Sequence, residues 1–129
     1  MRLTKKTDYC IRVLIYLQKH KGRVKIQDIA NSYNISKNHL SVAVNKLAEL
    51  NYITTTQGPT GGIEFNQSSE NQSVGKLVTE IEHFEIAECF DQKNNSCTLS
   101  SNCKLKSMLS KSTAAFIQEL KNYKIKDLI

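Results

Sequence analysis

The chain has 129 residues, a net charge of +6, and 40% hydrophobic and 23% charged residues. This length suits one domain with a substantial core, and this composition excludes a disordered chain. No apolar run reaches the length of a membrane span and no signal-peptide pattern opens the chain, so we expect a cytoplasmic protein with no membrane partner. In that compartment the four cysteines are expected to be reduced thiols rather than lasting disulfides.

The positive charge is placed unevenly along the chain. Residues 1–66 contain ten Lys and Arg against four Asp and Glu, whereas residues 67–129 contain eight of each kind. This asymmetry favours a polyanionic partner for the first half, with nucleic acid ahead of a membrane surface. A merely solvated charged face is the simpler alternative.

The first predicted element is an apolar helix from about Tyr9 to His20, with Thr7 as its N-cap residue. Its apolar side chains occupy more than one face, and a helix of this kind is covered on most sides. We therefore expect it to lie between the N-terminal core and a second structure, such as another subunit. Cys10 is expected to pack in the core rather than to bind a metal.

Two amphipathic helices separated by a short turn follow. The first is predicted from the spacing of Ile26, Ile29, Ala30 and Tyr33. Ser36 is a suitable N-cap for the second, which ends near 50–51 and has Leu40, Ala43, Val44 and Leu47 on its inner face. This pattern is typical of a helix-turn-helix, with an ordinary helical hairpin as the alternative.

The second of these helices carries small, polar or basic groups at its start and on its outer face. Such groups reach phosphates and base edges in a major groove. The candidate DNA contacts are Ser36, Lys37, Asn38, His39, Ser41 and Asn45.

A β-hairpin is predicted next, with β-prone residues at 52–56 and 63–65 around a turn-forming segment at 57–62. A hairpin directly after a helix-turn-helix predicts a winged helix, whose glycine-rich tip is free to lie along DNA. Further candidate contacts are therefore Gln57, Thr60, Gly61 and Gly62. Residues 1–66 are interpreted as a winged helix-turn-helix DNA-binding domain.

The second half begins with a polar linker at 66–72 and a helix capped by Ser73. A last, long helix is predicted to run to about Asn122, with an apolar stripe that suits dimerisation. Packing of this stripe against the first helix of the same chain is the alternative. The predicted fold is thus mainly α with a small β-hairpin wing. Residues 67–129 are interpreted as one compact unit that contains a cysteine-bearing loop and the dimerisation helices.

Three cysteines lie in a polar loop ahead of this long helix. They are Cys89, Cys97 and Cys103, and the last two sit among Asn and Ser, where packing does not explain a thiol. Their spacing matches neither a zinc ribbon nor a ferredoxin motif. A helix start and neighbouring lysines favour thiolate at Cys103, and thiolates bind soft metals and iron–sulfur clusters.

Three cysteines leave such a site one ligand short. His83 could complete a zinc site, and a carboxylate could complete an iron–sulfur cluster. From the residues alone, a winged-helix regulator that senses oxidation through its thiols, with zinc or with no metal, stays open. An enzyme is not expected, since neither a catalytic histidine motif, a phosphate-binding loop nor a nucleophile elbow is present.

Motifs along nearly the whole chain resemble the NsrR/IscR group of winged-helix iron–sulfur regulators, and in particular its nitric-oxide-sensing branch. The matching motifs are Met1-Arg2-Leu3-Thr4-Lys5 with Thr7-Asp8, Ile35-Ser36-Lys37-Asn38-His39-Leu40, Gly61-Gly62, Glu88-Cys89-Phe90-Asp91, Cys97, Cys103-Lys104-Leu105-Lys106, Ala115-Phe116 and Asp127-Leu128. Each motif is weak alone, and the ordered set is specific.

The resemblance implies a homodimeric repressor that binds double-stranded operator DNA and responds to nitric oxide. It also implies that Cys89, Cys97 and Cys103 hold an iron–sulfur cluster, with 4Fe–4S favoured over 2Fe–2S. The implied fourth ligand is Asp8, donated by the second subunit. The other branch of the group has a histidine three residues after the third cysteine, where this chain has Lys106.

The wing departs from the family pattern. Similar proteins carry arginines around the wing glycines, and this chain has Gln57, Pro59 and Thr60 instead. We therefore expect the wing of this chain to differ from that of similar proteins in its contribution to sequence reading. Backbone phosphates are expected to be contacted by positive charge at Arg2, Lys5, Lys6, Arg12 and Lys37.

Overall fold

The computed structural model describes the backbone of residues 1–129 and every side chain except that of Ser100. The main elements are α1 Lys5–Lys19, α2 Ile26–Tyr33, α3 Lys37–Glu49, β1 Ile53–Thr56, β2 Gly62–Phe65, α4 Val74–Ile81 and α5 Lys104–Leu120. Short 3-10 helices lie at Gln67–Ser69 (η1), Glu88–Phe90 (η2), Ser100–Asn102 (η3) and Ile125–Leu128 (η4). The predicted fold class, mainly helical with one β-hairpin, is confirmed.

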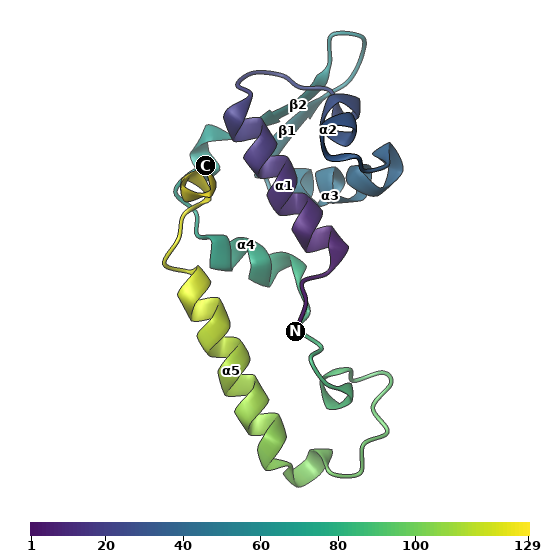
Figure 1. The fold of residues 1–129 in the computed structure, drawn as a ribbon, viewed down its shortest axis with the longest axis vertical. Helices are drawn as coiled ribbons and strands as arrows, with labels where there is room; N and C mark the ends of the chain where they lie inside the picture. The colour runs from purple at the N-terminus through teal and green to yellow at the C-terminus, as the bar shows by residue number, and fades with distance from the viewer.

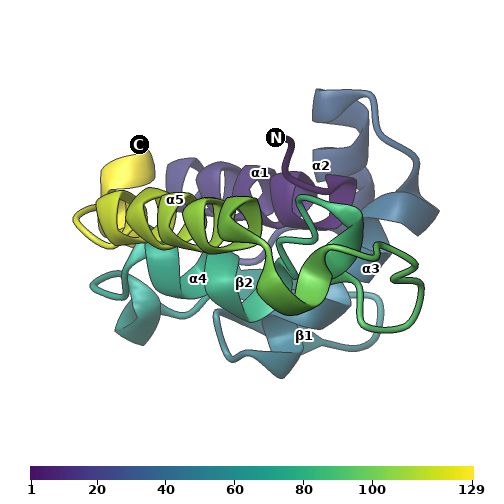
Figure 2. The same ribbon diagram turned by 90° about the horizontal axis from the view of Figure 1, so that it is seen from below.

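Figure 1 shows α1, α2, α3 and the hairpin together at one end of the molecule, with α4 beneath them. Helix α5 extends away from this unit, and the loop that carries three cysteines runs beside it. In Figure 2, the C-terminal turn and that loop lie at opposite ends of α5. The molecule is therefore a packed unit with a long helical extension.

Helix α1 begins earlier than the sequence predicts. Its N-cap is Thr4 rather than Thr7, and Thr7 is a fully buried residue inside the first turn. The prediction was wrong because both threonines suit an N-cap locally, and the choice is made by Glu82, far along the chain. The carboxylate of Glu82 accepts hydrogen bonds from the backbone N–H of Thr4 at 3.0 Å and from the Thr7 hydroxyl at 2.7 Å.

The remaining helices of residues 1–66 follow their predictions. Helices α2 and α3 have the expected inner residues, and Asn34 in the left-handed conformation makes the turn between them. Strands β1 and β2 pair antiparallel, from Ile53 opposite Phe65 to Thr56 opposite Gly62. The structure thus contains a helix-turn-helix followed directly by a wing.

A single hydrophobic core joins the two predicted halves of the chain. Residues of α1, α3 and α4 lie in one buried cluster, which also includes Ile125 from η4. The backbone N–H of Ile125 donates to the carbonyl of Gln72, and the Gln18 amide donates to the Ile125 carbonyl at 3.1 Å. The segment 66–72, expected to be a linker, contains η1 with Ser69 buried.

Candidate DNA-binding surface and cysteine loop

Helix α3 turns a polar face away from the core. Ser36 accepts a hydrogen bond from the His39 backbone N–H at 3.2 Å, so it caps the helix as predicted. The candidate contacts that are exposed on this helix are Lys37, Asn38, His39 and Asn45. A side-chain amide such as that of Asn38 suits bidentate contact with adenine, and Lys37 suits a phosphate.

Two other residues of α3 differ from expectation. The Ser41 hydroxyl donates to the Lys37 carbonyl at 2.8 Å, so its proton is already used within the helix. Val42 was not among the predicted contacts, although its side chain is 53% exposed. It lies about 200° around the helix from the buried Leu40, which a helical projection would have shown. An apolar group there suits contact with a thymine methyl.

The start of α1 meets the start of α3 at the surface. Lys5 and Lys6, together with His39 and Val42, line a shallow hollow of about 210 Å³. The structure therefore brings Lys5 and Lys6, two predicted phosphate contacts, to one surface with the outer face of α3. Arg2 lies elsewhere, in a hollow between residues 82–86 and α5. Contact between Arg2 and DNA stays a prediction.

The wing tip is made of exposed residues and two close-packed glycines. Gln57 and Thr60 are exposed, whereas Gly61 is buried. A Cβ on Gly61 would lie 2.1 Å from the Thr56 carbonyl oxygen, and one on Gly62 would lie 2.6 Å from that of Val24. Both glycines are thus needed for close backbone packing, and their contact with DNA stays a prediction.

The three loop cysteines come from three local structures. Cys89 lies in η2, Cys97 in the irregular segment after it, and Cys103 at the N-cap of α5. All three are half-buried thiols. Donors of this kind, near one another along one loop and partly accessible, suit an iron–sulfur cluster or another soft metal.

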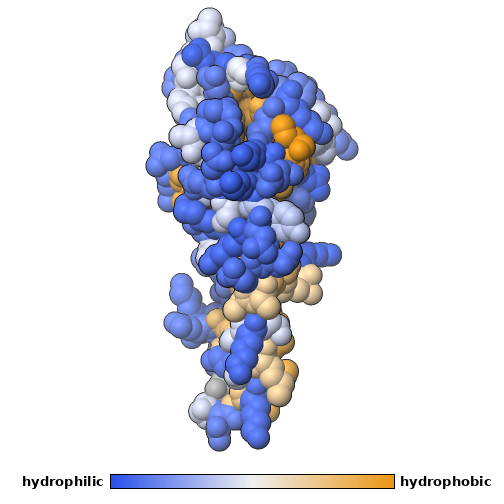
Figure 3. All heavy atoms as spheres, turned by 90° about the vertical axis from the view of Figure 1, so that its left-hand side faces the viewer, coloured by the Kyte–Doolittle hydropathy of each residue, from blue (hydrophilic) through white to orange (hydrophobic). Residues whose placement is uncertain are grey.

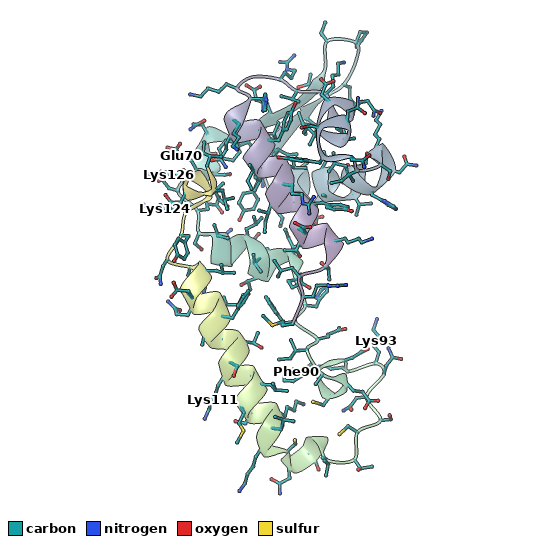
Figure 4. All side chains as sticks on the ribbon, in the orientation of Figure 1. Glu70, Phe90, Lys93, Lys111, Lys124 and Lys126 are labelled. Atoms are coloured by element: carbon teal, nitrogen blue, oxygen red, sulfur yellow. The ribbon has the colours of Figure 1, made fainter. Side chains whose placement is uncertain are left out.

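Side chains next to the cysteines connect the parts of this loop. The Glu88 carboxylate, beside Cys89, accepts hydrogen bonds from the Ser96 backbone N–H at 3.3 Å and from its hydroxyl at 2.6 Å. The ammonium of Lys106 lies 5.8 Å from the ring centre of Phe90. Figure 4 shows Phe90 on the side of the loop that faces α5. The residues on either side of Cys89 therefore contact Ser96, next to Cys97, and Lys106, three residues after Cys103.

Asp91 makes the tight turn that follows Cys89. Its carboxylate accepts from the side-chain amide of Asn94 at 2.9 Å and from the backbone N–H of Lys93 at 3.0 Å. These two bonds lower the pKa of Asp91 from its ordinary value. The carboxylate thus shapes the loop as an anion.

The loop cysteines are not gathered into a closed ligand set within this single chain. Among the described side chains, no three of His, Cys, Asp and Glu come close enough to hold one metal ion. His83, the predicted zinc ligand, is exposed outside any such group. The donor types fit a cluster, and binding would require the loop to bring the three thiols together.

Cys10 has a different environment from the loop cysteines. It is fully buried, and its thiol donates to the Ala43 carbonyl at 3.6 Å. Burial raises the pKa of this thiol to about 12. Cys10 is therefore an inert core residue, as the sequence predicts.

Asp8, the predicted fourth ligand, lies in the first turn of α1 and pairs with Arg12. The guanidinium donates to both carboxylate oxygens, at 3.1 and 2.9 Å, and this hydrogen bonding raises the pKa of Arg12. The two side chains are each 43% exposed. An exposed pair four residues apart on a helix contributes only about 0.3–0.5 kcal/mol, so Asp8 can leave Arg12 at little cost.

Glu82 has a structural role that the sequence did not predict. One of its carboxylate oxygens accepts from the Thr4 backbone N–H and hydroxyl, at 3.0 and 3.2 Å, and from the Thr7 hydroxyl. A carboxylate at a helix N-terminus is also favoured by the helix dipole. Glu82 thus fixes α1 at the point where the cysteine loop departs from α4.

Phe84 holds the beginning of the loop against α5. It has φ of +53°, which is strained for a bulky residue, and its ring meets that of Phe116 edge-on at 6.2 Å. The loop is therefore attached to α1 through Glu82 and to α5 through Phe84.

The helix-turn-helix, the wing and the polar face of α3 define a winged-helix DNA-binding protein. The chain belongs to the Rrf2 family, whose model, described as "Iron-dependent Transcriptional regulator", matches residues 3–129. It is accordingly a DNA-binding transcriptional regulator and not an enzyme. Among the described residues, no helix is long and apolar enough to cross a bilayer.

Relatives support this assignment over the full chain. The HTH-type transcriptional regulator NsrR of Bacillus licheniformis is 40% identical over 132 residues, covering all of this chain and 92% of that protein. The NsrR of Bacillus subtilis is 39% identical, covering 100% of this chain and 90% of that protein.

Solved structures share the fold at low identity. Staphylococcus aureus CymR in its oxidized form has a TM-score of 0.73 at 21% identity, covering 99% of this chain and 95% of that one. IscR of T. potens has a TM-score of 0.74 at 18% identity, covering 99% and 85%.

Proposed function

We propose that this chain is a repressor whose binding to operator DNA is controlled by an iron–sulfur cluster that senses nitric oxide. The observation that carries the proposal is the half-buried set of thiols, Cys89, Cys97 and Cys103, in a loop attached to a winged helix. The family description and the NsrR relatives point the same way. When bound, the cluster supplies iron that reacts with nitric oxide.

The three cysteines would hold the cluster, with Asp8 of a second copy as the remaining ligand. Asp8 is accessible and gives up only a weak interaction when it leaves Arg12. A homodimer is supported by the apolar surface of α5, where Leu105 is 58% and Met108 is 60% exposed. Figure 3 shows orange and pale orange patches over the part of the molecule that contains α5.

The contacts of the chain supply a route from the loop to the DNA-binding surface. A change in the loop would act on Glu82, and through Glu82 on the first turn of α1. Helix α1 packs against α3, where the thiol of Cys10 meets the Ala43 carbonyl. For the cluster to control DNA binding, it must interact more favourably with one conformation of these contacts than with another.

Iron and sulfide analysis tests the proposal. Protein reconstituted without oxygen is expected to contain iron and sulfide and to be coloured. The Cys97→Ala variant is expected to lose the iron, the sulfide and the colour. Cys10→Ala is the matched control, because it removes a thiol outside the loop and is expected to keep the colour. A colourless protein that binds zinc or no metal would instead support the thiol-sensing regulator.

A further inference from the structure

The tip of the wing has no charge of its own, yet two cations lie against it. Residues 57–62 contain neither Lys nor Arg. The Arg23 guanidinium donates to the Thr60 carbonyl at 3.2 Å, and the Lys25 ammonium donates to the Pro59 carbonyl at 2.8 Å. Both come from the connection between α1 and α2.

Backbone pairing between the α1–α2 connection and β2 positions the Arg23 and Lys25 side chains beside the wing tip. Val24 and Ile63 exchange backbone hydrogen bonds of 2.9 and 2.8 Å, so the connection forms an isolated antiparallel bridge with β2. Side chains alternate along an extended segment, so Arg23 and Lys25 share the side opposite Val24. Gly62 permits this approach, since a Cβ there would meet the Val24 carbonyl oxygen.

The position suits contact with DNA backbone. Figure 1 shows the α1–α2 connection and the hairpin loop at the same end of the molecule, far from α5. Both cations are exposed, and each hydrogen bond to the wing uses only one of several N–H donors. The remaining donors are available to a phosphate oxygen beside the glycine-rich tip.

We propose that Arg23 and Lys25 are the phosphate-binding residues of the wing, supplying from a neighbouring segment the charge that the wing lacks. This inference rests on DNA binding by the winged helix. The hydrogen bonds to Pro59 and Thr60 carbonyls position the cations, and the tip and the cations approach the same stretch of backbone. Phosphate contacts of this kind set register and affinity without reading sequence.

The salt dependence of DNA binding tests the inference. The probe is a duplex that the wild-type protein selects from a random-sequence library, with affinity measured by fluorescence anisotropy over a range of KCl concentrations. Arg23→Gln with Lys25→Gln keeps an amide donor for each wing carbonyl and removes both charges. For each phosphate that is no longer neutralised, the log–log slope is expected to flatten by about 0.9 and binding to weaken roughly fivefold to tenfold near 0.1 M salt.

Lys124→Gln with Lys126→Gln is the matched control, because it removes the same charge from η4 and the residue that caps it. Figure 4 shows both lysines beside Glu70, at a distance from the wing. The control is expected to keep the wild-type slope. Adding Thr60→Lys to the Arg23 and Lys25 variant is expected to restore part of the slope.

A wild-type slope in the Arg23 and Lys25 variant would overturn the inference while leaving DNA binding intact. A decrease in affinity without a change of slope, and without rescue by Thr60→Lys, would overturn it too, because it would show a role in wing stability alone. A wild-type protein that selects no duplex would overturn the DNA-binding proposal itself.

Discussion

At the scale of single residues, Glu82 connects two parts of the chain that the sequence separates. One carboxylate oxygen serves the Thr4 N–H and the hydroxyls of Thr4 and Thr7. Hydrogen bonds to a charged acceptor are stronger than neutral ones, about 1.5–3 kcal/mol each for well-formed cases. Because Glu82 is half-exposed, each of its hydrogen bonds contributes less than this value. Together, the three hydrogen bonds still make the carboxylate a main support of the first turn of α1.

Glu82→Gln tests that role. The amide oxygen is a weaker acceptor for the same three donors, so we expect the free energy of unfolding to fall by about 1–2 kcal/mol in urea denaturation. Glu85→Gln, an exposed carboxylate on the same segment, is expected to change it by less than about 0.5 kcal/mol. Equal effects of the two substitutions would contradict the role given to Glu82.

The four thiols are expected to differ in reactivity. Burial raises the pKa of Cys10 to about 12, so raising the pH from 7 to 9 leaves almost all of this thiol protonated. In cluster-free protein, iodoacetamide should therefore label Cys89, Cys97 and Cys103 first, and Cys10 only after unfolding. Mass spectrometry of the labelled peptides measures this order. Labelling of Cys10 at the rate of the loop cysteines in folded protein would show the assignment to be wrong.

At the scale of elements, the contact between α4 and α5 depends on Gly75. A Cβ there would lie 2.6 Å from the Lys121 Cγ, 2.7 Å from the Lys121 backbone nitrogen and 2.9 Å from the Ile117 carbonyl oxygen. Two of these three neighbours are backbone atoms, which cannot move aside as a flexible side chain can. The close approach of α5 to α4 therefore requires glycine, which has no side chain, at position 75.

Gly75→Ala is expected to destabilise the protein in spite of a better helix propensity. Alanine gains about 1 kcal/mol in a helix interior, whereas overpacking costs about 1–3 kcal/mol. Adding Lys121→Ala should recover stability only in part, because the backbone contacts remain. Urea denaturation measures both effects. A Gly75→Ala variant more stable than the wild type would contradict the close packing.

Most helices were predictable because their information is local. The spacing of Leu40, Ala43 and Leu47 defines α3, and Ser36 and Ser73 cap helices as expected. The start of α1 was not predictable, because Glu82 selects Thr4 over an equally good local candidate. The position of η4 was missed for the same reason, since Ile125 is buried by residues of distant elements. The charge beside the wing also comes from outside the wing.

At the scale of the whole molecule, the packed unit and the extension have different characters. The unit has a continuous core, whereas α5 has no buried residue and leaves Leu105 and Met108 exposed. Such an open apolar surface on a long helix suits a partner, and in the proposed homodimer a second copy of this chain would cover it and supply Asp8 to a cysteine loop. Two copies would then share each cluster site, so that DNA binding and dimer geometry change together.

Cluster control of DNA binding can be measured by titrating nitric oxide into anaerobically reconstituted protein while its affinity for the selected duplex is followed. We expect the protein to contain iron and sulfide and its affinity to fall by roughly fivefold to 150-fold on reaction, the usual range for such coupling. Cys97→Ala should show no response. Iron-containing protein whose DNA affinity does not change with nitric oxide would contradict the account.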